Sequence, residues 1–323
     1  MNISELSKKF NTQQKCINHL EKVRWGDSPT CPYCQTGDQT SKRKDGFRWI
    51  CNYCGNSFSV FIGTIFEDTN LPLPIWFQLI ALMINSKTGI SSCEIARNLG
   101  ITQKTAWYNA MKVRCAMLDQ SEMLTGICEM DEAYLGGSPR RGNQLPDNVP
   151  SISTVTSIKS KRGRGTKKIP VVGIVQRKGH IATKIIGKLT SRNLLAMLRK
   201  HVAVDRAVLI TDSFSSYNKF DEVLPHLTIE HQEAFKKGII DTNTIESFWS
   251  ILKNGIKGNY RAVSKKYLPF YLAEYSYKYN KRDLKDIGFK ETVENAVEEE
   301  KCFVNYKPKK EPKKLAYGRK GEK

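Results

Sequence analysis

Four cysteines, spaced as two Cys-x2-Cys pairs, constrain the fold of this chain more than any other feature. Cys31 and Cys34 form the first pair, and Cys51 and Cys54 form the second, with sixteen residues between the pairs. Two such pairs can present four thiolates to one tetrahedral Zn²⁺ at about 2.3 Å, which leaves no position open for a substrate. We therefore predict a zinc ribbon over about residues 24–60, with a structural rather than a catalytic ion.

Charge and hydropathy narrow the partners of the chain. Its 323 residues carry 52 Lys+Arg against 32 Asp+Glu, a formal net charge of +20, which favours a polyanion as the partner. No apolar run reaches the roughly 18 residues of a membrane span, and the N-terminus has no signal-peptide core. A total of nine cysteines is odd, which argues for a metal site and against a disulfide framework. We expect a soluble, cytoplasmic protein associated with the nucleoid, with no membrane partner.

Residues 89–117 have the pattern of a helix-turn-helix. Ile95 and Leu99 give an apolar face, Gly100 allows the turn, and Thr102 can cap a second helix. The second helix of such a motif enters the major groove of DNA with its N-terminal side chains leading. An ordinary helical hairpin is the alternative. The side chains that we expect on the outer, DNA-contacting face are Gln103, Lys104, Thr105, Tyr108, Asn109 and Lys112.

From residue 126 onward, strands alternate with helices, and three acidic residues stand out. Asp131 follows the apolar-leaning run 126–130, Asp212 follows the buried strand 206–211, and Glu246 lies on a helix that begins near residue 241. Carboxylates at two strand ends and on a following helix can hold two divalent cations, roughly 3.5–4 Å apart, for in-line displacement at phosphorus. Each aspartate can equally be an ordinary cap. The nearby acidic competitors are Asp205, Asp221, Glu129 and Glu132.

The helix that carries Glu246 is amphipathic. Its polar stripe also contains Lys253, seven residues further on, which is in position to hold a DNA phosphate near the ions. A solvated helix face is the alternative interpretation. The apolar stripe is Ile245, Phe248, Trp249, Leu252 and Ile256, and the polar stripe is Asn243, Glu246, Ser250, Lys253 and Lys257.

These segments together resemble a bacterial insertion-sequence transposase of the DDE type, from the group with an N-terminal zinc ribbon. The resemblance rests on 31–54, on Glu129–Gly137, on Leu209–Tyr217, and above all on Thr242–Tyr260 followed by Tyr271–Asn280. It implies a ribonuclease-H-like core that depends on Mg²⁺ or Mn²⁺. By position, the metal-binding triad is Asp131, Asp212 and Glu246, and Lys253 is the trailing basic residue. Some relatives carry asparagine as the third member, and Asn243 matches that position.

The expected fold is a multidomain α+β protein. Its parts are an N-terminal helix and zinc ribbon (1–65), a helix-turn-helix (70–120), a ribonuclease-H-like catalytic domain of mixed α/β structure (124–300) and a basic disordered tail (301–323). A further flexible basic loop is expected at 138–168.

The resemblance implies a DNA transposase. Such an enzyme binds the terminal inverted repeats of an element, cleaves its ends and joins the 3′-hydroxyl to target DNA by two-metal phosphoryl transfer. The expected partners are therefore double-stranded DNA and further copies of the same chain on that DNA. A structure-specific nuclease on the same core and a non-catalytic, domesticated DNA-binding regulator are the alternatives.

Overall fold

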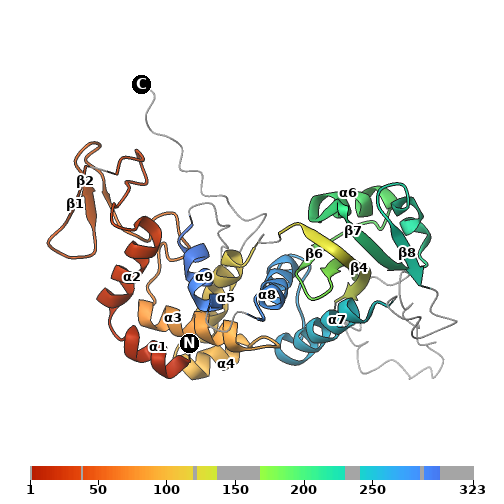
Figure 1. Cartoon of the computed structure of the whole chain (residues 1–323). Coiled ribbons are helices and arrows are strands. Elements are labelled where there is room, and N and C mark those ends of the chain that lie inside the picture. Colours follow the sequence, from red (N-terminus) through yellow and green to blue (C-terminus); the bar gives the residue numbers. More distant parts are fainter. Residues whose placement is uncertain are drawn as a thin grey trace, which may run out of the picture. The chain divides into compact units, whose positions relative to one another are not determined.

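A computed structural model describes residues 2–37, 39–118, 122–136, 168–229, 241–283 and 287–298. Most of the predicted basic loop and the whole predicted tail lie outside these residues. The chain divides into two compact units, residues 1–120 with 270–323, and residues 121–269. Figure 1 labels the helices and strands of the chain. No helix in the described part of the chain is both long and apolar enough to cross a bilayer.

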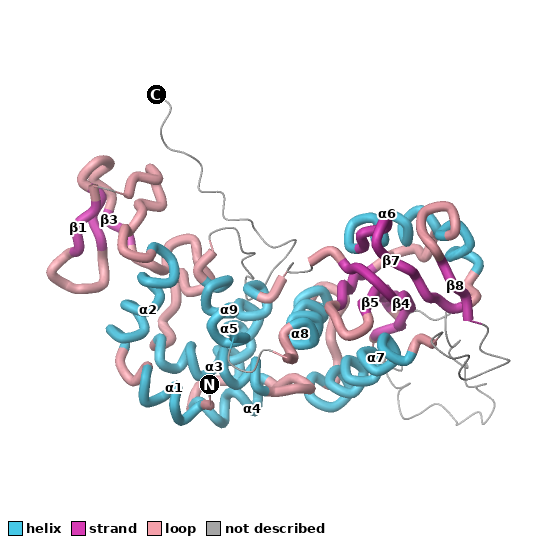
Figure 2. Tube along the Cα trace, in the orientation of Figure 1, coloured by secondary structure: helices cyan, strands magenta, loops and turns pink. Residues whose placement is uncertain are grey.

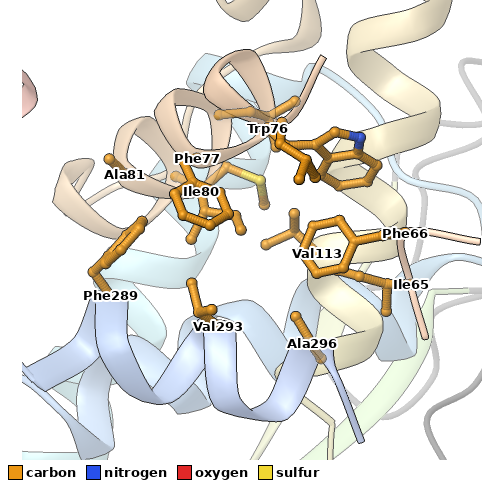
Figure 3. Packing of buried hydrophobic residues seen from close by; sticks show 14 of the residues in the cluster. Ile65, Phe66, Trp76, Phe77, Ile80, Ala81, Val113, Phe289, Val293 and Ala296 are labelled. Carbon is orange, nitrogen blue, oxygen red and sulfur yellow. The ribbon is translucent and has the colours of Figure 1, made fainter. Parts of the chain in front are cut away.

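The helices of the first unit pack around one large apolar core. Phe77 from α3 meets Phe289 from α9 with ring centroids 5.8 Å apart, and Val113 of α5 is also fully buried there (Figure 3). The helices are α1 (Ile3–Lys9), α2 (Gln13–Trp25), α3 (Leu73–Asn85), α4 (Ser92–Leu99), α5 (Gln103–Ala116), α8 (Leu268–Asn280), which joins the unit from Phe270, and α9 (Ile287–Ala296).

The boundaries of this unit differ from the expected domains. Residues 1–65 and 70–120 share one core, and that core also takes in Tyr277 of α8 and Val293 of α9, which we had placed in the catalytic domain. The amide of Ile65 donates to the carbonyl of Ala296 over 3.2 Å, so the two distant segments are joined directly. Amphipathic helices must bury their apolar faces, and sequence order does not say against which partner.

A small antiparallel sheet carries the cysteine pairs. The strands β1 (Thr40–Lys42), β2 (Trp49–Cys51) and β3 (Ser57–Phe58) lie in the order β1-β2-β3, with Thr40 opposite Cys51 and Trp49 opposite Phe58. Cys31, Cys51 of β2 and Phe58 of β3 form a small buried cluster.

The second unit is built on one mixed sheet, so the chain as a whole has the expected mixed α+β composition. Among the described residues, its strands follow the order β6-β5-β4-β7-β8. β5 is antiparallel to both β4 and β6, whereas β7 is parallel to both β4 and β8. The strands are β4 (Leu124–Leu135), β5 (Ile169–Gln176), β6 (Ile181–Ile185), β7 (Val202–Asp212) and β8 (His226–Ile229).

Helices cover the two faces of this sheet (Figure 2). The helix α6 (Ser191–His201) and the 3-10 helix η2 (Ser215–Phe220) bury Val172 and Ile174 of β5 on one face. The helix α7 (Asn243–Gly255) covers the other face, where Gly173 points. A Cβ atom on Gly173 would lie only 2.9 Å from the Trp249 ring, so the glycine allows α7 to approach β5 closely.

Candidate functional site

The four cysteines converge as their spacing predicts. Their four Sγ atoms all lie within 4.8 Å of one another. The Sγ–Sγ distance is 3.7 Å between Cys31 and Cys54 and 3.6 Å between Cys34 and Cys51. Each pair closes in the same way, because the amide after its second cysteine donates to the carbonyl of its first (Gln35 to Cys31, 2.9 Å; Gly55 to Cys51, 2.8 Å). Four thiols in this arrangement fit a closed, structural Zn²⁺ site.

The turn between α4 and α5 also follows the sequence. Gly100 ends α4 in the left-handed conformation at φ 64°, and the Thr102 side chain caps α5 by accepting from the amide of Thr105. Gln103 and Lys104 are exposed at the start of α5, whereas Thr105 and Tyr108 are half-buried. These four side chains are therefore accessible, and their contact with DNA stays a prediction.

Two other residues predicted on that outer face do not lie there. Asn109 is 5% exposed and Lys112 is 2% exposed, so the expectation that both face outward is wrong. The Lys112 ammonium donates to the carbonyl of Glu67 over 2.9 Å, and burial lowers the pKa of Lys112 to about 8. The long aliphatic part of a lysine can lie along apolar surface, so a polar residue type alone does not mark an outward position.

The two aspartates come together at the centre of the mixed sheet. The parallel register between β4 and β7 pairs Glu129 with Ile210. Asp131 and Asp212 each follow two residues further along their strands, and their carboxylates lie close together. Asp212 ends β7 as predicted, but Asp131 lies inside β4 rather than at its end. The strand continues past Asp131 because it stays paired with β5 as far as Leu135.

Glu132 completes this carboxylate group, although sequence reasoning named it only as a nearby competitor. One carboxylate oxygen from each of Asp131, Glu132 and Asp212 lies within 4.8 Å of the other two. Consecutive residues of a strand point to opposite faces, so pattern reasoning assigns Asp131 and Glu132 to different sites. The one signal in the sequence was that Glu132 directly follows Asp131, but the alternation of faces along a strand argued against a shared site.

Neutral donors hold one oxygen of each carboxylate. The Trp249 indole donates to Asp131 Oδ2 (3.1 Å), the Tyr217 hydroxyl to Glu132 Oε2 (2.7 Å) and the Phe214 amide to Asp212 Oδ1 (3.2 Å). Burial, together with the negative charges of Glu132 and Asp212, raises the pKa of Asp131 to about 6. Clustered carboxylate oxygens are the ligands that Mg²⁺ and Mn²⁺ prefer, so the group fits a hard divalent cation.

Glu246 is not a member of this group among the described residues. It is exposed on α7, in the same stripe as Asn243 and Lys253, and its Oε1 accepts from the Thr242 hydroxyl over 3.1 Å. Trp249 lies one turn further along the same helix and contacts Asp131, so α7 itself lies against the carboxylates. The amphipathic pattern is confirmed, because Ile245, Phe248, Trp249 and Leu252 are all buried.

A buried carboxylate outside the predicted triad ties α7 to the sheet. Glu129 of β4 is fully buried and accepts from the Arg177 guanidinium, the Thr244 hydroxyl and the amide of Ile245. Arg177 also donates to Asp241, just before the helix. Sequence reasoning gave Glu129 no role, because its partners lie 48 and more residues away.

Two segments of the chain match models of known protein families. Residues 123–280 match the ISXO2-like transposase domain of the IS1595 type, and residues 11–57 match the transposase zinc-ribbon domain. The chain is 25% identical over 276 residues to an uncharacterized protein in transposable element ISH50 of Halobacterium salinarum (strain ATCC 700922 / JCM 11081 / NRC-1). That alignment covers 82% of this chain and 90% of the relative.

Similar solved structures are more distant. The Mos1 strand transfer complex aligns at 11% identity and TM-score 0.27, covering 68% of this chain and 78% of that one. A simian T-cell lymphotropic virus intasome in complex with PP2A regulatory subunit B56 gamma aligns at 12% identity and TM-score 0.28, covering 57% and 63%.

Proposed function

The chain belongs to the DDE transposases of the IS1595 group with a zinc ribbon, and from this premise we propose that it is an active DNA transposase. It binds the terminal inverted repeats of an insertion sequence, cleaves the element ends and joins the 3′-hydroxyl to target DNA. One observation carries the proposal. The parallel register of β4 and β7 brings Asp131 and Asp212 together, although 80 residues separate them in the chain.

The sheet supports a ribonuclease-H-like assignment for the catalytic core. Its middle strand β4 has one antiparallel neighbour, β5, on one side and the parallel strands β7 and β8 on the other, with helices on both faces. Residues on adjacent parallel strands lie side by side even when they are distant in sequence. Two acidic side chains can therefore share a cation across such a pair of strands.

Asp131 and Asp212 hold the divalent cations, Mg²⁺ or Mn²⁺, and α7 supplies the third ligand. Cations held there would supply activation of the attacking oxygen and neutralisation of charge on the leaving oxygen. We assign the third position to Glu246 because a carboxylate brings negative charge and two donor atoms, whereas Asn243 brings one neutral carbonyl oxygen. Lys253 lies on the same exposed stripe and holds a phosphate of the DNA.

The helix pair α4 and α5 reads the element ends as a helix-turn-helix, with Gln103, Lys104, Thr105 and Tyr108 as the candidate contacts. Gln103 donates to the Ser92 hydroxyl over 2.7 Å, which holds the two helices together at their N-terminal ends. The net charge of +20 supports phosphate contacts beyond this helix and retention on the nucleoid. Joining two element ends requires two active sites, so the active form is a homo-oligomer on DNA.

The third ligand is tested by comparing Glu246→Gln with Asn243→Ala in a metal-dependent cleavage assay on element-end DNA. Ser250→Ala, on the same exposed stripe, is the matched control and should keep full activity. We expect Glu246→Gln to lose cleavage and Asn243→Ala to keep most of it. An active Glu246→Gln with an inactive Asn243→Ala would give the third position to the asparagine. Cleavage without joining in the wild type would indicate a nuclease instead.

A further inference from the structure

The first turn of α7 is capped from outside the helix. The first amides of a helix have no intrahelical partner, and the residue before the helix often supplies one. Here Thr242 precedes α7, but its side chain caps no backbone amide. The carboxylate of Glu129 on β4 accepts from the Ile245 amide instead, over 3.0 Å. A carboxylate is favoured at this end of a helix, because the helix dipole is positive there.

This external cap leaves the Thr242 hydroxyl for another partner. The hydroxyl donates to Glu246 Oε1 over 3.1 Å, so it orients the side chain that we assign as the third metal ligand. Glu129 is thus linked to Glu246 through the backbone of the first turn.

Arg177, in the β5–β6 hairpin, donates hydrogen bonds both to Glu129 and to Asp241. Its Nε donates to Glu129 Oε1 over 2.6 Å, and its Nη2 donates to the Asp241 carbonyl (2.7 Å) and to Asp241 Oδ1 (3.0 Å). Asp241 Oδ1 also accepts from the Asn243 amide over 3.1 Å. One guanidinium therefore joins the sheet to the residues that begin α7.

The spacing of two acidic residues on β4 matches the spacing of the two residues that they contact on α7. Glu129 and Asp131 point to the same face of β4, about 6.6 Å apart along the strand. Ile245 and Trp249, which they contact, are one turn or about 6 Å apart along α7. One repeat of the strand thus matches one turn of the helix, and the Glu129 contact sets where Trp249 meets Asp131.

We propose that Glu129 and Arg177 are positioning residues that dock α7 on β4 and so set Trp249 and Glu246 against the Asp131–Asp212 pair. The proposal rests on the proposed function for the identity of the metal site. Glu129 is fully buried, and neither residue belongs to the carboxylate group. Their effect is exerted through the position of the helix, and losing the contact weakens the site while the sheet keeps its fold.

The test uses the full-length chain with three variants. Glu129→Gln keeps the shape of the side chain and removes its charge, and Arg177→Lys keeps a charge near Glu129 without the planar fork that reaches both acids. Asp205→Asn is the matched control, because Asp205 pairs with Arg206 on β7 with both side chains more than 70% exposed. The measurements are amide hydrogen exchange of residues 243–255, Mn²⁺ affinity by calorimetry, and the rate of end cleavage.

We expect Glu129→Gln to speed exchange in 243–255 while residues 206–212 stay protected, and to weaken Mn²⁺ affinity and cleavage by about 10- to 100-fold. Arg177→Lys should fall between it and the wild type, and Asp205→Asn should match the wild type. Unchanged exchange in α7 would overturn the docking contact. Faster exchange with unchanged Mn²⁺ affinity and cleavage would overturn the positioning role.

Asp131→Ala separates this proposal from the proposed function. If Asp131→Ala binds Mn²⁺ like the wild type, the assigned metal site is wrong, and the positioning role falls with it. If Asp131→Ala loses Mn²⁺ binding while Glu129→Gln does not, the metal site stands and the positioning role is overturned.

Discussion

The two candidate metal sites of this chain are built in opposite ways. The four cysteines lie within residues 31–54, and short-range hydrogen bonds inside each pair shape both halves of their site. The carboxylates Asp131 and Asp212 lie on separate strands, and Trp249 of α7 contacts Asp131 from a third part of the chain. The thiol site therefore depends on local backbone geometry, whereas the carboxylate site depends on strand register and on the docking of one helix.

The largest expected effect concerns the local site. Cys51→Ser should reduce the zinc content from one ion per chain to none and unfold the ribbon, because structural zinc contributes about 10–16 kcal/mol to folding in zinc-finger peptides. Metal analysis and near-ultraviolet circular dichroism measure the two effects. Zinc content that survives Cys51→Ser would contradict the site. The second unit should keep its fold, since no cysteine ligand belongs to it.

The next effect concerns the assembled site. Asp131→Ala and Asp212→Ala should each lower end cleavage by at least about 10³-fold, because transition-state charge loses its electrostatic stabilisation. Zinc content and binding to element ends should stay unchanged. Gel-based cleavage and joining assays with Mg²⁺ measure the loss. Activity within tenfold of the wild type in either variant would exclude the aspartate from the catalytic site.

A smaller effect should follow from moving α7 without touching a carboxylate. In Gly173→Ala, the new Cβ meets the Trp249 ring at 2.9 Å and Ile245 at 3.2 Å, so these side chains must shift, and we expect α7 to move with them. A displaced catalytic group typically loses up to about 10²-fold in rate, and we expect a 10- to 100-fold slower cleavage. Gly187→Ala is the matched control, because no atom lies within 4 Å of its added Cβ. Equal rates for the two variants would show that α7 tolerates displacement.

The smallest effect concerns DNA binding by α5. Lys104→Ala should weaken binding to element ends a few-fold and lower the salt slope by about one, as expected for one lost phosphate contact. Lys112→Met, four residues before the end of the helix, should leave binding unchanged because Lys112 is buried. Fluorescence anisotropy at several salt concentrations measures both. A larger loss in Lys112→Met than in Lys104→Ala would reverse our assignment of the accessible face.

Several features could be read from the sequence because neighbouring residues decide them. The cysteine pairs converge as predicted, Gly100 turns the chain after α4, and Thr102 caps α5. The buried stripe of α7 follows helical periodicity, which local spacing alone sets. In each case the relevant partners lie within a few residues or on one helix.

Other features could not be read in this way. The sequence predicts an exposed Lys112, but its ammonium donates a hydrogen bond to the backbone carbonyl of Glu67, 45 residues away. The helix α9 reads as part of the catalytic domain, but its apolar face completes the core of the first unit. Residue type shows whether a side chain requires apolar surroundings or hydrogen-bond partners. Only the folded structure shows which residues supply them.

The sequence by itself determined the ribbon with its four converging cysteines and the helix pair, and it singled out Asp131 and Asp212, which the fold brings together. The tertiary structure decided which groups join them. Strand register brought Glu132 into the carboxylate group, and the buried Glu129 cap placed α7 on β4. The physical reason is the range of the interactions. Turns and caps depend on adjacent residues, whereas a site shared by two strands and a helix exists only once long-range packing has set their positions.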